Sequence, residues 1–296
     1  MKNTYKLLSF VVAVAALCAC QDTAGPIQTK VYSFEDSTAH ATFRMAAELP
    51  TGTDKVSTAI REMLLDLIDD QLGHIVSYEG ERQFGAFDGD RSDTEAFLKY
   101  YFAKSLDILA RDSDKDARDR ESYMSDDPEM DDARREEILS RMPGWEYEFN
   151  LSKTGDTDRY AVFQSQDYVY LGGAHGGVTG AGCLTFDKKT GARVEEFLDD
   201  SCTEEIQPLL RRGLVSYFGE WDPDINEDNL VDCLILEGDR IPLPAWPPYP
   251  SEDGLVFTYQ QYEIAPYAAG MPSFAIPLED LAGYLTPEAK KLLGVE

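Results

Sequence analysis

Hydrophobic and polar positions alternate with two different periods along this chain. Two short apolar runs, residues 31–34 and 41–47, predict strands, and apolar residues then recur at helical spacing over residues 56–72. The same spacing returns over residues 98–109, just after a capping-box sequence at residues 92–95. The first third of the chain is therefore expected to form two strands and two amphipathic helices whose apolar faces belong to a core.

Residues 111–137 interrupt this pattern. They are crowded with charged side chains and contain few aliphatic ones. Such a composition buries little apolar surface, so it predicts an acidic solvated loop or a loosely formed helix.

From Trp145 the period becomes two, because aromatic and apolar residues alternate with polar ones over residues 145–151. A third helix is predicted over residues 206–218 and a short final helix between Thr286 and Gly294, whereas the prolines of residues 242–250 favour an extended crossing. Further strands are predicted over residues 160–163, 168–171, 183–186, 194–197, 255–259, 262–264 and 274–276. The pattern predicts an α+β fold, with a mostly antiparallel sheet packed against a few helices in two linked α/β subdomains.

The N-terminus has the layout of a secretory signal, with two lysines before an apolar run and a small residue at its end. That run is shorter than the roughly 20 residues of a membrane-spanning helix. Leu17-Cys18-Ala19-Cys20 resembles the bacterial lipobox. We therefore expect a signal peptide over residues 1–19, acylation of Cys20 and a polar tether over residues 20–30. The predicted location is the bacterial cell envelope, as a membrane-anchored lipoprotein, with the outer membrane favoured.

The net charge of the chain limits the classes of molecule that it is expected to bind. Without residues 1–19, which hold Lys2 and Lys6, the chain has 25 basic and 55 acidic residues and a formal charge of −30. Nucleic acid is therefore not an expected partner, and contact with the membrane is expected through the acyl chains of Cys20.

Three further cysteines remain in this disulfide-permissive setting. We predict a bridge between Cys202 and Cys233, which flank one helical segment, and we expect Cys183 to be buried in a strand. None of the three has metal-ligand spacing. The acidic runs 112–116 and 222–226 begin like calcium loops, but both lack the glycine and glutamate that an EF-hand loop needs at its sixth and twelfth positions. No metal site is predicted, and a weak calcium site of a kind other than an EF-hand remains an alternative.

Catalytic motifs are also missing from the sequence. The three histidines have no nucleophile or ligand spacing, and there is no Gly-x-Ser-x-Gly, His-Glu-x-x-His or phosphate loop. We therefore predict no catalytic residue and no cofactor. With 55 acidic residues, a carboxylate pair acting on glycans remains an alternative that spacing in sequence does not test.

A glycine-rich run follows the strand predicted over residues 168–171, and it forms the first of three blocks. Residues 170–176, 186–191 and 262–270 resemble the ordered signature of a domain-of-unknown-function family. This family occurs in the extracellular part of the lysozyme-sensing anti-sigma factor RsiV and in the amino-terminal part of the peptidoglycan deacetylase PdaC. The resemblance implies an RsiV-like domain over residues 167–296, preceded by a companion domain over residues 31–166.

This resemblance implies a non-enzymatic envelope module that binds a protein, with a lysozyme-like protein as first candidate, or a cell-wall component. The alternatives are an enzyme acting on peptidoglycan or other glycans, and a structural lipoprotein. Glycines in these runs indicate close approach of the backbone to a neighbour, which is either a ligand or the other signature run. The candidate binding residues are Tyr170, Gly172, Gly173, His175, Gly176, Tyr262, Pro266, Tyr267 and Gly270.

Overall fold

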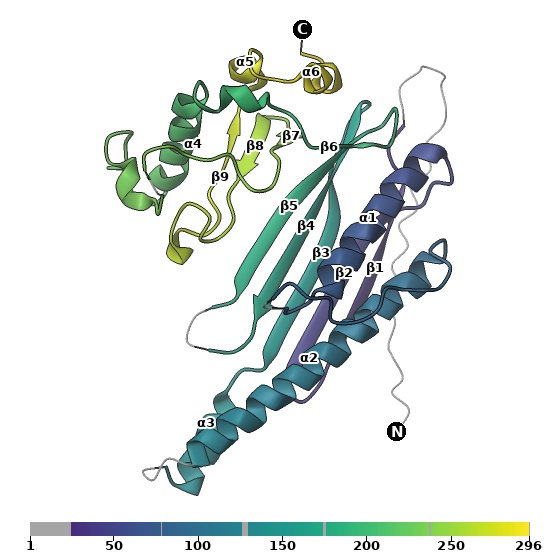
Figure 1. The fold of residues 1–296 in the computed structure, drawn as a ribbon, viewed down its shortest axis with the longest axis vertical. Coiled ribbons are helices and arrows are strands. Elements are labelled where there is room, and N and C mark those ends of the chain that lie inside the picture. The colour runs from purple at the N-terminus through teal and green to yellow at the C-terminus, as the bar shows by residue number, and fades with distance from the viewer. Residues whose placement is uncertain (1–24, 78, 126–129, 174–175, 237, 296) are drawn as a thin grey trace.

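The computed structural model describes residues 25–295 except Tyr78, residues 126–129, residues 174–175 and Glu237. Its largest element is a six-stranded sheet with the strand order β1-β2-β3-β4-β5-β6 (Figure 1). Neighbouring strands are antiparallel except for the parallel pair of β2 and β3. The strands are β1 Thr29–Ser37, β2 Ala41–Pro50, β3 Trp145–Asp156, β4 Tyr160–Tyr170, β5 Val178–Asp187 and β6 Arg193–Val194.

Two helices, α1 Lys55–Gly73 and α2 Thr94–Ser125, cover one face of this sheet (Figure 1). Strand β2 alternates buried and half-buried residues, so its apolar side chains enter the core beneath the helices. Asp54 caps α1 by accepting hydrogen bonds from the backbone N–H groups of Val56 and Ser57. The strand and helix pairs predicted for the first third of the chain are therefore confirmed.

The described residues of the charged stretch 111–137 are mostly helical, so of the two predicted alternatives the solvated loop was wrong and a helix forms there. Helix α2 continues to Ser125, and α3 spans Asp132–Arg141 beyond the end of the sheet (Figure 1). The stretch contains good helix formers, and ion pairs one turn apart support the helix, such as Asp116 with Arg120 at 2.7 Å. Residues 112–116 are therefore helical rather than a calcium loop.

A smaller unit follows the large sheet and has its own core. It consists of a three-stranded antiparallel sheet with helices on it, which confirms the α+β fold class. The elements are β7 Tyr249–Ser251, β8 Gly254–Thr258, β9 Ser273–Ile276, α4 Gln207–Gly219, α5 Leu278–Leu281, α6 Pro287–Leu293, and the short 3₁₀ helices η1 Asp200–Thr203, η2 Leu230–Cys233 and η3 Tyr267–Ala269.

The boundary expected between residues 166 and 167 falls inside strand β4. The two cores instead divide between Phe186, which packs in the larger one, and Phe197, which packs in the smaller one. Two strand predictions were also wrong. Residues 262–264 form a turn because Tyr262 has a φ of 66°, and only Arg193–Val194 is a strand near residues 194–197.

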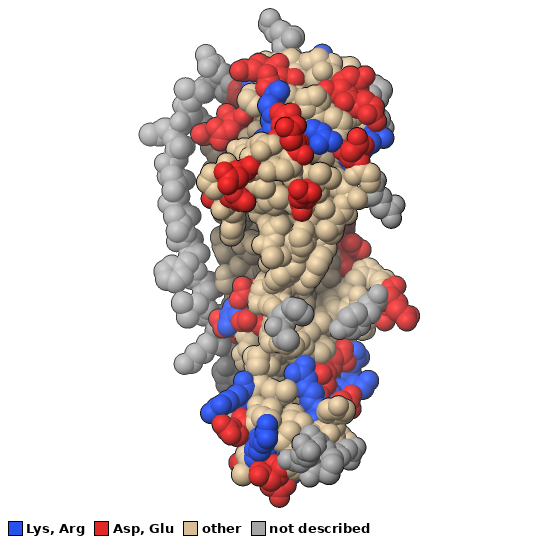
Figure 2. Space-filling view, turned by 90° about the vertical axis from the view of Figure 1, so that its left-hand side faces the viewer, with Lys and Arg blue, Asp and Glu red and all other residues tan. Residues whose placement is uncertain are grey.

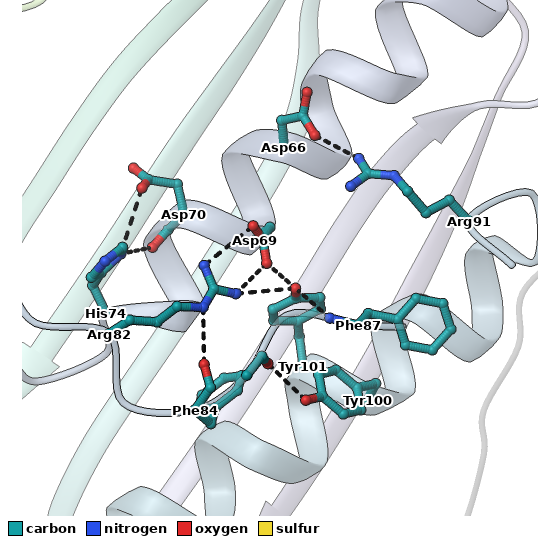
Figure 3. A network of polar contacts seen from close by, with 11 residues as sticks. Asp66, Asp69, Asp70, His74, Arg82, Phe84, Phe87, Arg91, Tyr100 and Tyr101 are labelled. Atoms are coloured by element: carbon teal, nitrogen blue, oxygen red, sulfur yellow. Dashed lines mark hydrogen bonds and ion pairs between the residues drawn. The ribbon is translucent and has the colours of Figure 1, made fainter. Parts of the chain in front are cut away.

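The connection between α1 and α2 is held by a polar network (Figure 3). Tyr101 donates a hydrogen bond to Asp69 and accepts one from the backbone N–H of Phe87, at 3.1 Å. Arg82 pairs with Asp69 and donates through Nε to the carbonyl oxygen of Phe84, at 2.9 Å. This network fixes an irregular connection to both helices, so its role is structural.

Cys183, Cys202 and Cys233 are thiols in the structure, so the predicted bridge between Cys202 and Cys233 is not formed there. Cys202 is buried in the smaller core and Cys233 borders the same core from η2, so the pairing stays a prediction. Cys183 is buried in β5, and burial raises its thiol pKa to about 12, as expected for an unreactive cysteine.

No helix in the described part of the chain is long and apolar enough to cross a membrane. The described residues also contain no cluster of three or more histidine, cysteine or acidic side chains placed to hold a metal ion.

Candidate functional site

The glycine-rich run forms the loop between β4 and β5. Tyr170 ends β4 and donates a hydrogen bond to the carbonyl oxygen of Gly173, at 3.1 Å. Gly172 and Gly173 have φ values of 76° and 132°, which side chains other than glycine rarely adopt. His175, the titratable candidate of this loop, lies outside the described residues.

Gly172 also lets the tip of α2 approach the loop. A Cβ atom at Gly172 would lie 2.5 Å from Nη2 of Arg120, and this guanidinium donates to the carbonyl oxygen of Leu171, at 3.4 Å. The first signature run is therefore packed against a helix that sequence analysis did not connect with it.

The first and third signature runs contact each other. Tyr267 donates to the carbonyl oxygen of Gly177, at 2.7 Å, and a Cβ atom at Gly176 would lie 2.8 Å from the same hydroxyl. Pro266 precedes η3, and Gly270 ends it with a φ of 70°. Tyr267 and the glycines around it therefore hold the two runs together, as the alternative reading of their close approach expected.

Side chains of the smaller unit also satisfy the open edge of β5. The amide of Gln260 accepts from the backbone N–H of Ala181, at 3.0 Å, and donates to its carbonyl oxygen, at 2.7 Å. Gln261 accepts from the backbone N–H of Thr179, at 2.8 Å. The two glutamine side chains thus make hydrogen bonds to backbone groups of β5 that a neighbouring strand would otherwise make, so this edge is not open to pairing with another strand.

Trp246 completes this junction between the two units. Its ring packs against the larger core from the proline-rich segment, and a Cβ atom at Gly182 would lie 2.1 Å from it. No pattern in the sequence had marked Trp246, Gln260 or Gln261 as candidate residues. A glycine within a strand, which often marks close approach of another group, was the available signal for Trp246.

Three exposed apolar side chains lie on segments that meet at this junction: Val178, Ile235 and Tyr262 are 49%, 52% and 58% exposed. Val178 precedes the residue that bonds Gln261, and the backbone N–H of Ile235 donates to the carbonyl oxygen of Ile264, at 2.9 Å. We call these three residues the seam patch. Figure 2 shows a band without charged side chains crossing this side of the molecule, below a region rich in acidic ones.

Asp167 is the candidate that an enzymatic role would use, because burial raises its carboxyl pKa to about 6. The strand register places Phe149 and Gly180 on either side of it. Ser165 and Val169 lie before and after it on the same face. No second carboxylate neighbours Asp167 within the described sheet, whereas glycoside hydrolysis uses two about 5–10 Å apart.

Replacing Asp167 by asparagine is expected to stabilise the protein at pH 7.5 by about 1–2 kcal/mol. The folded protein holds the Asp167 proton up to about pH 6, whereas the unfolded chain releases it near pH 4. Stability is therefore lost as pH rises through this window, and the neutral amide avoids that loss. Urea unfolding of both proteins at pH 4 and 7.5 checks the prediction, and an equal difference at the two pH values contradicts it.

Comparison with known proteins gives a family match for part of the chain. Residues 247–279 match the family described as "Protein of unknown function (DUF3298)". This range contains β7, β8, β9 and most of the junction residues of the smaller unit. No curated protein matches the chain.

Solved structures give the fold. A DUF3298 family member from Bacteroides fragilis NCTC 9343 is 17% identical with a TM-score of 0.62, and the match covers 90% of this chain and 98% of that one. A DUF3298 family protein from Pseudomonas aeruginosa PAO1 is 13% identical with a TM-score of 0.53, covering 90% and 97%. At these identities the likeness concerns the fold alone. The chain thus shares the overall fold of solved DUF3298 family proteins and carries a DUF3298 match in its smaller unit.

Proposed function

We propose that this protein is a lipid-anchored envelope protein that binds a cationic protein at the seam patch and catalyses no reaction. The observation that carries the proposal is Tyr262, an exposed aromatic residue in a left-handed backbone conformation. That conformation costs about 1–2 kcal/mol for a residue with a side chain. Backbone strain of this kind gathers at functional sites, and tyrosine is common among residues that dominate binding.

Charge supports a cationic partner. The segment between α4 and Ile235 of the seam patch, which includes η2, exposes five acidic side chains: Asp222, Asp224, Glu227, Asp228 and Asp232. Together with the overall acidic charge, this rim speeds the approach of a basic protein and orients it. The resemblance to the RsiV envelope domain makes lysozyme a suitable probe.

The anchor is proposed to be Cys20, which lies outside the described residues. Changing Cys20 to alanine should release the protein from membranes, because the lipobox offers no other cysteine directly after a small residue. Fractionation after a high-salt wash measures the release, and circular dichroism should remain unchanged. Retention of the alanine variant in the membrane fraction contradicts the anchor.

Binding of lysozyme to the acyl-free protein should persist at about 0.15 M salt, where the Debye length is roughly 8 Å. Changing Tyr262 to alanine should weaken binding at least tenfold because it removes the exposed ring. Changing Tyr262 to glycine should weaken it equally while stability is kept or raised by up to about 1 kcal/mol, since glycine adopts this backbone without strain. Titration calorimetry and urea unfolding measure the two effects.

Tyr123 provides a matched control, because it is 82% exposed on α2 and lies outside the seam patch. Its change to alanine should leave lysozyme binding unaltered. Binding that disappears at the higher salt, or that ignores both Tyr262 variants, would reduce the attraction to nonspecific charge and contradict the proposal.

A further inference from the structure

A concave site lies near the C-terminal end of α2, apart from the seam patch. It is a cavity of about 480 Å³ between α2, the segment after α3, the β1–β2 turn and the start of β3. This volume falls within the range of small-molecule sites, about 300–1,000 Å³. The lining residues that matter for its chemistry are His40, Asp114, Asp116, Arg118, Arg120 and Trp145.

Three of these side chains are fixed before any ligand arrives. Asp116 accepts from the indole Nε1 of Trp145, at 3.1 Å, and from Nε of Arg120, at 3.0 Å. Arg120 also donates to the carbonyl oxygen of Leu171. A ring, a carboxylate and a guanidinium are thereby held in one arrangement, and such preorganisation lowers the entropy cost of binding.

Two glycines make this arrangement possible. Gly172 leaves room for the Arg120 guanidinium, as described above. A Cβ atom at Gly144 would lie 2.8 Å from the carbonyl oxygen of His40, which accepts from the backbone N–H of Trp145, at 2.8 Å. Gly144 therefore lets the β1–β2 turn close against the start of β3 and brings His40 beside Trp145.

Several polar groups in the cavity remain available to a ligand. Within the described residues, the side chains of His40, Asp114 and Arg118 make no hydrogen bond or ion pair, and the hydrogen bonds of Arg120 use Nε and Nη2. The Nη1 donors of Arg120, together with these three side chains, offer both donors and acceptors around the Trp145 ring.

We propose that this cavity binds a short saccharide of one or two pyranose rings. Acidic and basic lining groups are mixed, which favours a neutral ligand with many hydroxyl groups over an anion or a cation. The half-buried Trp145 supplies an apolar face for a sugar ring, and its indole N–H is already satisfied by Asp116. Asp114, Arg118 and His40 then hydrogen-bond the hydroxyl groups.

The position of the cavity in the fold suits an anchored protein. Strand β3 begins at Trp145 in the cavity and ends at Asp156, which binds the backbone N–H of Ile27 where the chain enters the fold. From the first to the last of its twelve residues the strand spans about 36 Å, at about 3.3 Å for each step between neighbours. The cavity therefore lies at the end opposite the entry of the tether.

Calorimetric titration of the acyl-free protein with N,N′-diacetylchitobiose and with cellobiose tests the proposal. We expect saturable one-to-one binding of at least one of them, with a Kd of about 1 mM or below. Changing Trp145 to leucine should weaken that binding at least tenfold. Changing Arg118 to alanine should weaken it about threefold or more, and because Arg118 is exposed on a helix, this variant tests the site even if the leucine variant fails to fold.

The seam-patch variant with alanine at Tyr262 is the matched control, because it should lose lysozyme binding and keep saccharide binding. This pair of measurements separates failure of the saccharide site from failure of the proposed protein-binding function. Absence of saturation up to about 20 mM of either disaccharide overturns the saccharide site. Unchanged saccharide affinity in the folded Trp145 and Arg118 variants overturns it as well.

Discussion

Replacing Asp156 by alanine is expected to lower the free energy of unfolding by about 3–5 kcal/mol. The Asp156 carboxylate is 13% exposed and lies between two ammonium groups, 2.6 Å from Nζ of Lys188 and 2.7 Å from Nζ of Lys153. Lys188 is only 1% exposed. Removing the carboxylate therefore leaves a buried positive charge without its partner. Among single substitutions, such a loss is one of those that lower the free energy of unfolding most.

The same carboxylate also fixes the start of the fold. It accepts from the backbone N–H of Ile27, at 2.8 Å, and Lys153 donates to the carbonyl oxygen of that residue, at 2.7 Å. A bulge in β3 between Lys153 and Gly155 shifts the register just before Asp156. The alanine variant should therefore also loosen the entry of the tether, seen as faster amide exchange at Ile27.

Two further variants test whether the loss of stability comes from the buried charge of Asp156. Asparagine at position 156 keeps an acceptor for Ile27 but loses the charge, so its loss of stability should be smaller than that of alanine. Asp158 is the control, since it is 57% exposed in its side chain and 3.9 Å from Arg159. Its change to alanine should alter stability by less than about 0.5 kcal/mol. Equal urea midpoints for the Asp156 and Asp158 alanine variants would contradict the role of the buried pair.

Local patterns of the sequence predicted most elements, and the failures have physical causes. The strand at residues 145–151 and the helix at residues 56–72 follow from periodicity, because one face of each packs on a core. Helix α2 extends beyond its run of helically spaced apolar residues. Its charged residues form ion pairs along the helix surface, and these pairs stabilise the additional turns. Residues 262–264 alternate like a strand, but the left-handed Tyr262 turns the chain there.

The candidate site was predictable only in part. The sequence identified Gly172, Gly176 and Tyr267 as candidate binding residues. Local patterns did not predict which residues they contact, because these contacts, such as that of Gly172 with Arg120, join distant parts of the chain. The cavity depends on Asp116, which lies in the charged stretch whose composition predicted a solvated loop or a loosely formed helix, with no candidate site in it. Lys188 belongs to a signature run and is buried in an ion pair, which shows that a signature residue can serve folding rather than binding.

Replacing Trp246 by alanine is expected to cost about 3 kcal/mol, at the lower end of values for large aromatic residues because the ring is only half-buried. The ring lies against Gly182 of β5 and is the part of the proline-rich segment that packs on the larger core. Without it, the junction keeps the packing of Tyr160 and Val194 on the smaller core. It also keeps the polar contacts of Gln260, Gln261 and Tyr267, each worth about 1 kcal/mol.

The loss of Trp246 should therefore uncouple the two cores. Calorimetric unfolding should change from one cooperative transition to two, with the smaller core unfolding separately from the larger one. Trp221 is the control, because it is 74% exposed, and its change to alanine should shift stability by less than about 0.5 kcal/mol. A single transition, shifted by less than 1 kcal/mol in the Trp246 variant, would contradict the coupling.

This uncoupling has a consequence for the proposed function. Val178 of the seam patch belongs to the larger sheet, whereas Ile235 and Tyr262 belong to the smaller unit, so their common surface exists only while the two units are docked. The Trp246 variant should therefore bind lysozyme more weakly, by about tenfold, although no residue of the patch has changed. The saccharide cavity lies wholly within the larger unit, so its affinity for disaccharide should stay the same. If the Trp246 variant loses lysozyme affinity and disaccharide affinity equally, the variant is unfolded as a whole, and the seam patch has not been disrupted by separation of the two units.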